Sequence, residues 1–224
     1  KWKAAEMSNL GFDLNMFNNK VQLSAEYYIK NQNDLLVKIP VTAAFGRVSG
    51  AGDPWVNLGE IQNRGFEFVG TYSKMEGSFN YNISANLTTV KNEVKYIPGD
   101  ILTGNNITTP GHTIGSFYGY VAERILTPND FDQEGNYLHA MPATGNPAQG
   151  DLKFKDLNND GTVNDLDRTI IGKAVPDFTY SLNLEFFYKN FDLTLFFYGM
   201  QNFDVYNHLR SDIEAFSDQD MGHN

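Results

Sequence analysis

Hydrophobic and polar residues alternate along most of this chain, with a period of two residues. Such alternation indicates β-strands that have one apolar and one polar face. Two alternating stretches joined by a very short turn indicate an antiparallel hairpin. The pattern therefore predicts three hairpins, with strands at residues 11–17 and 21–30, 66–73 and 79–88, and 178–188 and 191–198.

The connections between these hairpins are much longer than the turns inside them. Residues 31–60 and 96–175 form two such connections, and a third begins near Met200. In an antiparallel sheet, this places the short turns at one end of the strands and the long loops at the other end. Long structureless loops argue against a compact soluble domain, whereas short periplasmic turns and long outer loops are the usual form of outer-membrane barrels.

The composition of the two faces favours the same interpretation. The polar face is rich in Asn, Ser and Thr and carries few charges, and the apolar face is aromatic. Several strands exceed the roughly 9–11 residues that cross a bilayer at a tilt. Aromatic residues also lie beside the short turns, where a membrane barrel has an aromatic girdle; they are Phe17, Phe79, Tyr188 and Phe191.

We therefore expect an all-β fold that is part of a transmembrane antiparallel β-barrel, with long extracellular loops and short periplasmic turns. About six strands are too few to enclose a wide pore, so residues 1–224 are expected to be a fragment of one barrel domain. Alternation alone also fits a soluble sandwich, because the pattern looks the same when it is turned inside out.

Composition narrows the class of partner. The formal net charge is −10 and no basic stripe is present, which argues against nucleic acid. The absence of cysteine excludes a disulfide framework and thiol chemistry. No run of about 18 apolar residues occurs, so the sequence predicts no transmembrane helix.

One segment, residues 156–167, has the spacing of a calcium-binding loop of the EF-hand type. Calcium prefers about six to eight oxygen ligands, which such a loop presents at alternate positions around a glycine that makes the sharp turn. The glycine here is Gly161, and the expected ligands are Asp156, Asn158, Asp160, the Thr162 carbonyl, Asn164 through water, and Asp167.

We expect this loop to hold a structural calcium ion that clamps a long outer loop. Asp167 replaces the usual Glu at the last position, and its shorter side chain makes bidentate binding less secure. No amphipathic helix flanks the loop, so a regulatory EF-hand is not predicted. The alternatives are magnesium and an ion-free turn, since Asn, Asp and Gly favour turns for their own reasons.

The sequence carries no catalytic motif, and we expect no enzyme activity. It lacks a G-x-S-x-G elbow, an H-E-x-x-H metal motif and a glycine-rich phosphate loop. Asp130 and Asp132 are interpreted as part of a polar loop rather than as an acid–base pair. The histidines are scattered in predicted loops or tails, where we expect them to be solvated: His112, His139, His208 and His223.

Aromatic residues in the predicted outer loops are candidates for contact with a nutrient. Sugar rings stack on aromatic faces, while Asn, Asp and Gln side chains hold the hydroxyl groups. The alternative is that these side chains pack the loops together or against a partner. The candidates are Trp55, Phe117, Tyr118 and Tyr120.

An ordered set of short segments also carries a family likeness. The segments are Asn9-Leu-Gly-Phe-Asp13, Tyr27-Tyr-Ile-Lys30, Asn57-Leu-Gly-Glu-Ile-Gln-Asn-Arg-Gly-Phe-Glu67, Ile114-Gly-Ser-Phe-Tyr-Gly119, Gly150-Asp-Leu-Lys-Phe-Lys-Asp-Leu-Asn-Asn-Asp-Gly161, Asp167-Arg-Thr-Ile-Ile-Gly172 and Pro176-Asp-Phe178. In this order they resemble the C-terminal half of the barrel in the SusC/RagA family of TonB-linked outer-membrane receptors of Bacteroidota. The likeness covers nearly the whole chain.

The resemblance implies a function that the alternation does not. It implies a lipid-embedded barrel of about 22 strands around a plug domain, and TonB-powered import of oligosaccharides or peptides. It also implies a SusD-like surface lipoprotein as a lid over the outer loops. The plug, the segment that contacts TonB and the last strands are not among these residues. The alternative hypothesis is a soluble calcium-binding β-sandwich used for carbohydrate binding or adhesion.

Overall fold

The computed structural model describes residues 2–38, 54–143 and 145–210. Its strands are β1 (Ala4–Met16), β2 (Val21–Lys38), β3 (Trp55–Lys74), β4 (Phe79–Thr89), β5 (Lys91–Tyr96), β6 (Ile101–Thr103), β7 (Asn106–Thr108), β8 (Ser116–Gly119), β9 (Ala122–Ile125), β10 (Met141–Pro142), β11 (Leu152–Phe154), β12 (Thr162–Val163), β13 (Thr169–Gly172), β14 (Phe178–Tyr188) and β15 (Phe191–Gln201). Two short 3-10 helices are η2 (Pro128–Asp130) and η3 (Asp165–Asp167). Among the described residues, no helix is long and apolar enough to cross a membrane.

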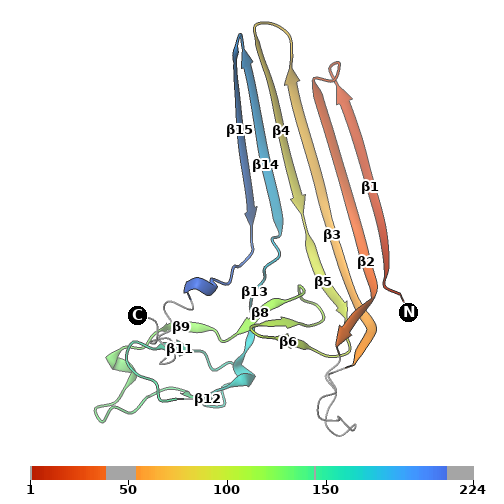
Figure 1. Ribbon diagram of the computed structural model, residues 1–224. Coiled ribbons are helices and arrows are strands. Elements are labelled where there is room, and N and C mark those ends of the chain that lie inside the picture. The colour runs from red at the N-terminus through yellow and green to blue at the C-terminus, as the bar shows by residue number, and fades with distance from the viewer. Residues whose placement is uncertain (1, 39–53, 144, 211–224) are drawn as a thin grey trace, which may run out of the picture.

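The long strands form one antiparallel sheet of seven strands. Six of them follow the order β1-β2-β3-β4-β14-β15, and β5 pairs with β3 beyond the end of β4. The three predicted hairpins are confirmed as β1–β2, β3–β4 and β14–β15. Figure 1 shows the tight turns together at one end of these strands and the loops that contain β6 to β13 at the other end.

Several strands extend further than the alternation predicts, since β1 already begins at Ala4. Residues 31–60 are not one long loop, because β2 continues to Lys38 and β3 begins at Trp55. The extended pairing joins Leu36 to Asn57 and Val37 to Val56, beyond a bulge that includes Asp34 with φ 57°. A backbone ladder does not require alternating side chains, so it continues where the alternation stops.

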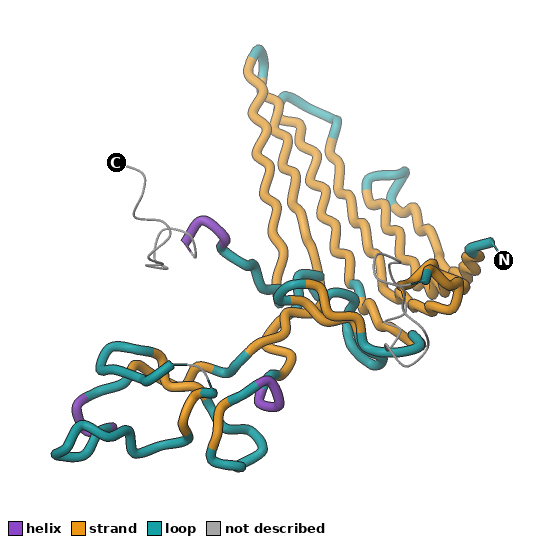
Figure 2. Tube along the Cα trace, turned by 60° about the horizontal axis from the view of Figure 1, so that its bottom comes forward, coloured by secondary structure: helices purple, strands orange, loops and turns teal. Residues whose placement is uncertain are grey.

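The predicted loop at residues 96–175 is also more structured than expected. It contains a four-stranded sheet of order β13-β8-β7-β6 and two pairs of short strands, β9 with β11 and β10 with β12. Figure 2 shows these strands and their turns as a lobe that extends from the end of the large sheet. We call residues 96–175 the outer lobe. No second sheet covers the seven-stranded sheet within the described residues, so the β-sandwich alternative is wrong for them.

The apolar face of the sheet has the height of a bilayer core. On β14, this face carries Phe178 at one end and Tyr188 at the other, over 11 residues. Ten steps of about 3.3 Å at a tilt of about 40° project to about 25 Å. This is the height of the lipid-facing band of outer-membrane barrels. The face is open in the structure, and its large residues are exposed, such as Phe197 at 53%.

The polar face is joined by cross-strand hydrogen bonds. The Ser73 hydroxyl donates to Asn82 Oδ1 at 2.6 Å, and Asn82 Nδ2 donates to Glu185 Oε2 at 3.0 Å. Near the outer lobe this face also carries the apolar cluster of Ile61, Val94 and Ile97. The polar side chains suit an aqueous lumen, which is the inward environment of a membrane barrel.

Candidate functional site

The predicted calcium loop lies between β11 and β13 and folds as a series of tight turns. Asp156 accepts hydrogen bonds from the backbone N–H groups of Asn159 at 2.6 Å and Gly161 at 2.9 Å. Asn159 and Gly161 have positive φ angles of 58° and 85°. These left-handed residues let the chain curl around the first carboxylate, which explains the glycine at the sixth position.

The next two side chains of the loop point back at its own backbone. Asn158 Oδ1 accepts from the N–H of Asp160 at 2.9 Å, and Asp160 Oδ1 accepts from the N–H of Thr162 at 2.8 Å. Asn158 Nδ2 also donates to Asp160 Oδ2 at 2.9 Å. The oxygen-bearing side chains at alternate positions are thus held close together.

Asp167 closes the loop from a buried position, with 0% of its surface exposed. Its carboxylate accepts the N–H groups of Asn164 and Leu157, each at 2.8 Å, and that of Asn158 at 3.3 Å. These hydrogen bonds, led by that from Asn164, hold the pKa of Asp167 below its ordinary value. Asn164 in turn accepts the N–H of Leu166 at 2.8 Å and caps helix η3.

The donor set fits calcium in part. A carboxylate offers about four lone-pair positions, and Asp167 already uses three of them for backbone N–H groups. Bidentate closure by Asp167 is therefore not available in this conformation. Asp156, Asn158, Asp160 and the Thr162 carbonyl keep free lone pairs and are hard oxygen donors of the kind that calcium prefers. No group of three or more His, Asp or Glu side chains forms a metal cluster in the described part of the chain.

Three of the four predicted aromatic ligand residues lie together in the outer lobe. Phe117, Tyr118 and Tyr120 line a cavity of about 580 Å³ that Arg168 and Tyr206 also line. The Arg168 guanidinium lies 4.7 Å from the centre of the Tyr118 ring and donates to the Tyr118 carbonyl at 3.3 Å. We call this space the aromatic cavity.

Trp55 does not join this group. It stands at the start of β3, paired with Lys38, and is 59% exposed. It does not line the aromatic cavity. A nutrient in that cavity would therefore meet the three residues of the outer lobe and not the tryptophan.

Tyr120 connects the aromatic cavity to the calcium loop. Its hydroxyl donates to Asp165 Oδ1 at 3.2 Å, and its ring lies 5.5 Å from that of Phe154. Burial, followed by the hydrogen bond to Asp165, raises the pKa of Tyr120 above its ordinary value. The position of this ring therefore depends on the fold of the loop.

An ion-pair network around one buried carboxylate in the outer lobe is absent from the sequence interpretation. Asp130 is 1% exposed and accepts both terminal nitrogens of Arg124, while His139 Nε2 lies 2.6 Å from Asp130 Oδ1. Asp130 and Asp132 both lie in the connection expected to be a polar loop; Asp130 is buried in it, whereas the Asp132 carboxylate accepts hydrogen bonds from Asn136. His139 has an exposed position, with its side chain 33% exposed beside Asp130, whereas His223 lies outside the described residues.

The sequence contains one signal that points to this network. Thr127-Pro-Asn-Asp130 has the form of a helix start, with a Thr cap and an acidic residue three positions later. In the structure the N–H of Thr127 donates to Asp130 Oδ2 at 2.8 Å. The pairing with Arg124 has no such local signature.

Comparison with known proteins agrees with this architecture. Residues 6–203 match the sequence family described as TonB dependent receptor-like, beta-barrel. The chain is 31% identical over 221 residues to TonB-dependent receptor P3 of Formosa agariphila, covering 93% of this chain and 21% of that protein. It is 27% identical over 225 residues to TonB-dependent receptor SusC of Bacteroides thetaiotaomicron, covering 92% of this chain and 20% of that receptor.

Solved structures share the fold. The RagAB peptide importer in its open-open state aligns with a TM-score of 0.68 at 19% identity, covering 90% of this chain and 21% of that chain. The closed-closed state aligns with a TM-score of 0.65 at 18% identity, covering the same shares. The chain therefore spans about a fifth of the length of the relatives it matches, 21% of receptor P3.

Proposed function

The chain belongs to the TonB-dependent receptor β-barrels of the bacterial outer membrane, in the SusC/RagA family, and on this premise we propose that it is part of an active importer of large nutrients. The family consists of receptors and transporters rather than enzymes. The match over residues 6–203 is the observation that carries the proposal. TonB would supply the energy for import through parts of the receptor that are not among residues 1–224.

The proposed cargo is an oligosaccharide or a peptide. The aromatic cavity supports contact with either class, because aromatic faces stack on sugar rings as well as on apolar side chains. Arg168 adds a cation that pairs with a carboxylate where the cargo has one. RagAB is a peptide importer, and its likeness to this chain concerns the fold alone.

The proposed partner is a SusD-like lipoprotein that closes over the outer lobe. The lobe lies at the edge of the sheet that carries the long loops, where a barrel opens to the outside (Figure 1). Such a lid would face the aromatic cavity from outside and enclose the cargo between two proteins. The seven-stranded sheet would form part of the barrel wall around the path of the cargo.

We also propose that the loop at residues 156–167 holds a structural calcium ion. Its hydrogen-bonded turns and its free oxygen atoms support this role, and Tyr120 connects it to the aromatic cavity through Asp165. The ion would fix the position of that ring rather than take part in transport. Magnesium is the less suitable ion, because it demands a nearly ideal octahedron of ligands.

An import assay with the full-length receptor tests the proposal. A strain that lacks the receptor is grown on single oligosaccharides or peptides as the carbon source, with the corresponding monomers as controls. We expect growth to fail on one class of polymer and to persist on its monomers. Wild-type receptor should restore growth, whereas a receptor without its TonB-contacting segment should not. Unchanged growth on every polymer would contradict the proposal.

The aromatic cavity has a separate readout in the same assay. The double substitution Phe117→Ala with Tyr118→Ala removes two rings from it, and we expect uptake at low nutrient concentration to fall by about tenfold, since two stacked rings contribute about 1–3 kcal/mol. Trp55→Ala, outside the cavity, is the matched aromatic control and should leave uptake unchanged. Equal uptake by the double variant and wild type would show that the aromatic cavity does not bind the cargo.

A further inference from the structure

The apolar face of the sheet ends in a row of cations at the side of the outer lobe. The register places Tyr27 beside Phe66 and joins β4 to β14 through Thr89 and Phe178 in the last apolar row. One step further, Arg64 lies opposite Lys91. The apolar band therefore gives way to positive charge at the level where a lipid bilayer changes from acyl chains to headgroups.

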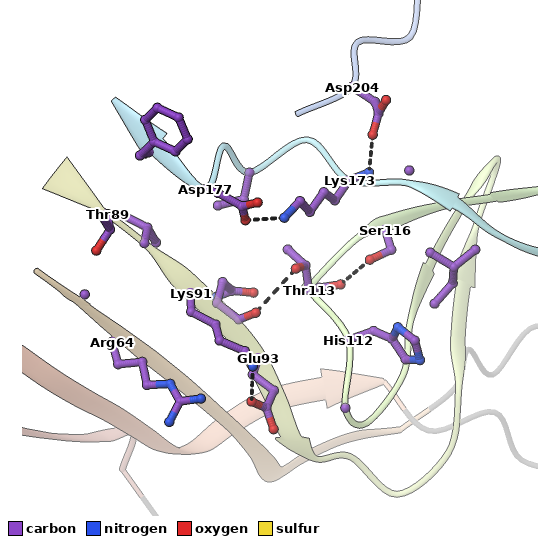
Figure 3. Close-up of a pocket in the computed structure, with 18 of the residues that line it drawn as sticks. Arg64, Thr89, Lys91, Glu93, His112, Thr113, Ser116, Lys173, Asp177 and Asp204 are labelled. Atoms are coloured by element: carbon purple, nitrogen blue, oxygen red, sulfur yellow. Dashed lines mark hydrogen bonds and ion pairs between the residues drawn. The ribbon is translucent and has the colours of Figure 1, made fainter. Parts of the chain in front are cut away.

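The direction of these two side chains follows from their neighbours. Asn63 and Asn92 meet on the polar face, where Asn92 Nδ2 donates to Asn63 Oδ1 at 2.7 Å. Because successive residues of a strand point to opposite faces, Arg64 and Lys91 share the lipid-facing side. Figure 3 shows both side chains beside Glu93 on the adjacent strands.

Arg64 and Lys91 are only partly neutralised by the residues that the structure describes. Like charges directly opposite one another in a sheet destabilise it, and only Glu93 lies close by. Glu93 binds Lys95 at 2.6 Å, so Lys91 is left at 4.0 Å with its side chain 62% exposed. The Arg64 side chain forms no ion pair or hydrogen bond with any residue that the structure describes, although its charge acts on Glu93. Three cations thus share one carboxylate in a chain whose formal net charge is −10.

A cavity of about 790 Å³ joins the charged row to the apolar row. Its lining includes Tyr27, Phe66 and Phe178 on one side and Arg64 and Lys91 on the other. Lys173 binds Asp177, and Asp204 accepts the backbone N–H of Lys173 at 3.0 Å (Figure 3). Three cations and three carboxylates line the cavity in all. Arg64 and Lys91 are the two cations that lie one step from the apolar row of Tyr27, Phe66 and Phe178.

We propose that this cavity binds a phosphate-bearing lipid of the surrounding membrane, with the phosphate on Arg64 and Lys91 and an acyl chain along Tyr27, Phe66 and Phe178. Arg and Lys form strong charge-assisted hydrogen bonds with phosphate, and the Arg guanidinium does so through two parallel bonds. A free anion would bind the cations without contacting the aromatic residues. A lipid contacts both, and lipids surround this face of the sheet in the membrane. The proposed import function is not required for this binding.

Lipid binding to the full-length receptor in detergent tests the proposal. Native mass spectrometry measures bound phosphatidylglycerol and, in parallel, diacylglycerol with the same acyl chains. We expect wild-type receptor to retain phosphatidylglycerol and to bind diacylglycerol far more weakly. Arg64→Ser with Lys91→Ser should weaken phosphatidylglycerol binding by about tenfold or more, because each cation near a membrane surface contributes about 1 kcal/mol.

Two further variants separate a site from a general charge effect. Lys30→Ser with Lys155→Ser removes the same charge from the polar face and the outer lobe, and its lipid binding should match wild type. Arg64→Lys with Lys91→Arg keeps the charge and should retain the lipid. Heat-dependent mobility on gels confirms that each barrel is folded. Wild-type binding by the serine variant, equal loss in the control, or displacement of the lipid by inorganic phosphate at the same concentration would each overturn the proposal.

Discussion

At the scale of single residues, Asp130 organises one end of the outer lobe. Its buried carboxylate binds Arg124, the Thr127 N–H and His139 at once. The hydrogen bond from Arg124 is the main cause that holds the pKa of Asp130 far below its ordinary value. Replacing the carboxylate removes several charge-assisted hydrogen bonds at once, while the Arg124 side chain, 44% exposed, stays partly hydrated.

Replacing Asp130 by Asn should therefore loosen the lobe locally. We expect backbone amides at Leu126 and Leu138, which donate beside this network, to exchange about tenfold faster with solvent, since a hydrogen bond to a charged group contributes about 1.5–3 kcal/mol. Asp132→Asn, at a partly exposed position nearby, is the control and should leave them unchanged. Equal exchange in both variants would show that the network does not hold the lobe.

The same carboxylate predicts a dependence on pH. Because the folded pKa of Asp130 lies below that of the unfolded chain, about 3.9, its contribution to stability is complete above that value. The contribution is lost as the pH falls toward the folded pKa. Amide protection near Asp130 should thus stay constant from neutral pH to about pH 5 and decline in stronger acid. The Asp130→Asn variant should lack this decline.

At the scale of elements, the loop at residues 156–167 connects β11 to β13 and carries its own turns. Its spacing alone suggests an EF-hand ligand set, but Asp167 is committed to backbone N–H groups from three residues. The side chains of Asp156, Asn158 and Asp160 are then the ones that would hold an ion. The loop thus depends on Asp167 for its shape and on Asp156 and Asp160 for its proposed calcium.

Asp156→Ala with Asp160→Ala should abolish stoichiometric calcium in metal analysis of the purified receptor. The aromatic cavity should lose order at Tyr120, because Asp165 is its hydrogen-bond partner. Asp132→Ala with Glu134→Ala removes two carboxylates elsewhere in the lobe and is the matched control. Calcium content that is equal in both variants and wild type would exclude the ion from this loop.

At the scale of the whole molecule, one sheet separates two environments. The face with Leu182 and Phe197 is apolar, and the face with Ser181 and Asn183 is polar. In a membrane barrel the apolar face must contact lipid, and substitutions on the two faces should then differ sharply in cost. The proposed lipid cavity lies at the border of the first face.

Leu182→Arg and Ser181→Arg test this assignment in the full-length barrel. Arginine at the middle of the lipid face costs about 2–4 kcal/mol, whereas on the lumen side it contacts water. We expect urea unfolding in lipid vesicles to show that loss for Leu182→Arg and almost none for Ser181→Arg. The reverse result would show that the face of Ser181 contacts lipid and the face of Leu182 lines the lumen, and would contradict the assignment.

The sequence by itself determined the hairpins, the two faces of the sheet and the shape of the turns around Asp156. These features are local, since they depend on a period of two residues or on the spacing within one loop. Only the tertiary structure decided the continuation of β2 along β3, the pairing of Asp130 with Arg124, and the meeting of Arg64 with Lys91. Each of these depends on the register between strands or on the folding of a connection. The stabilising contacts form between residues that the local sequence pattern does not relate to one another.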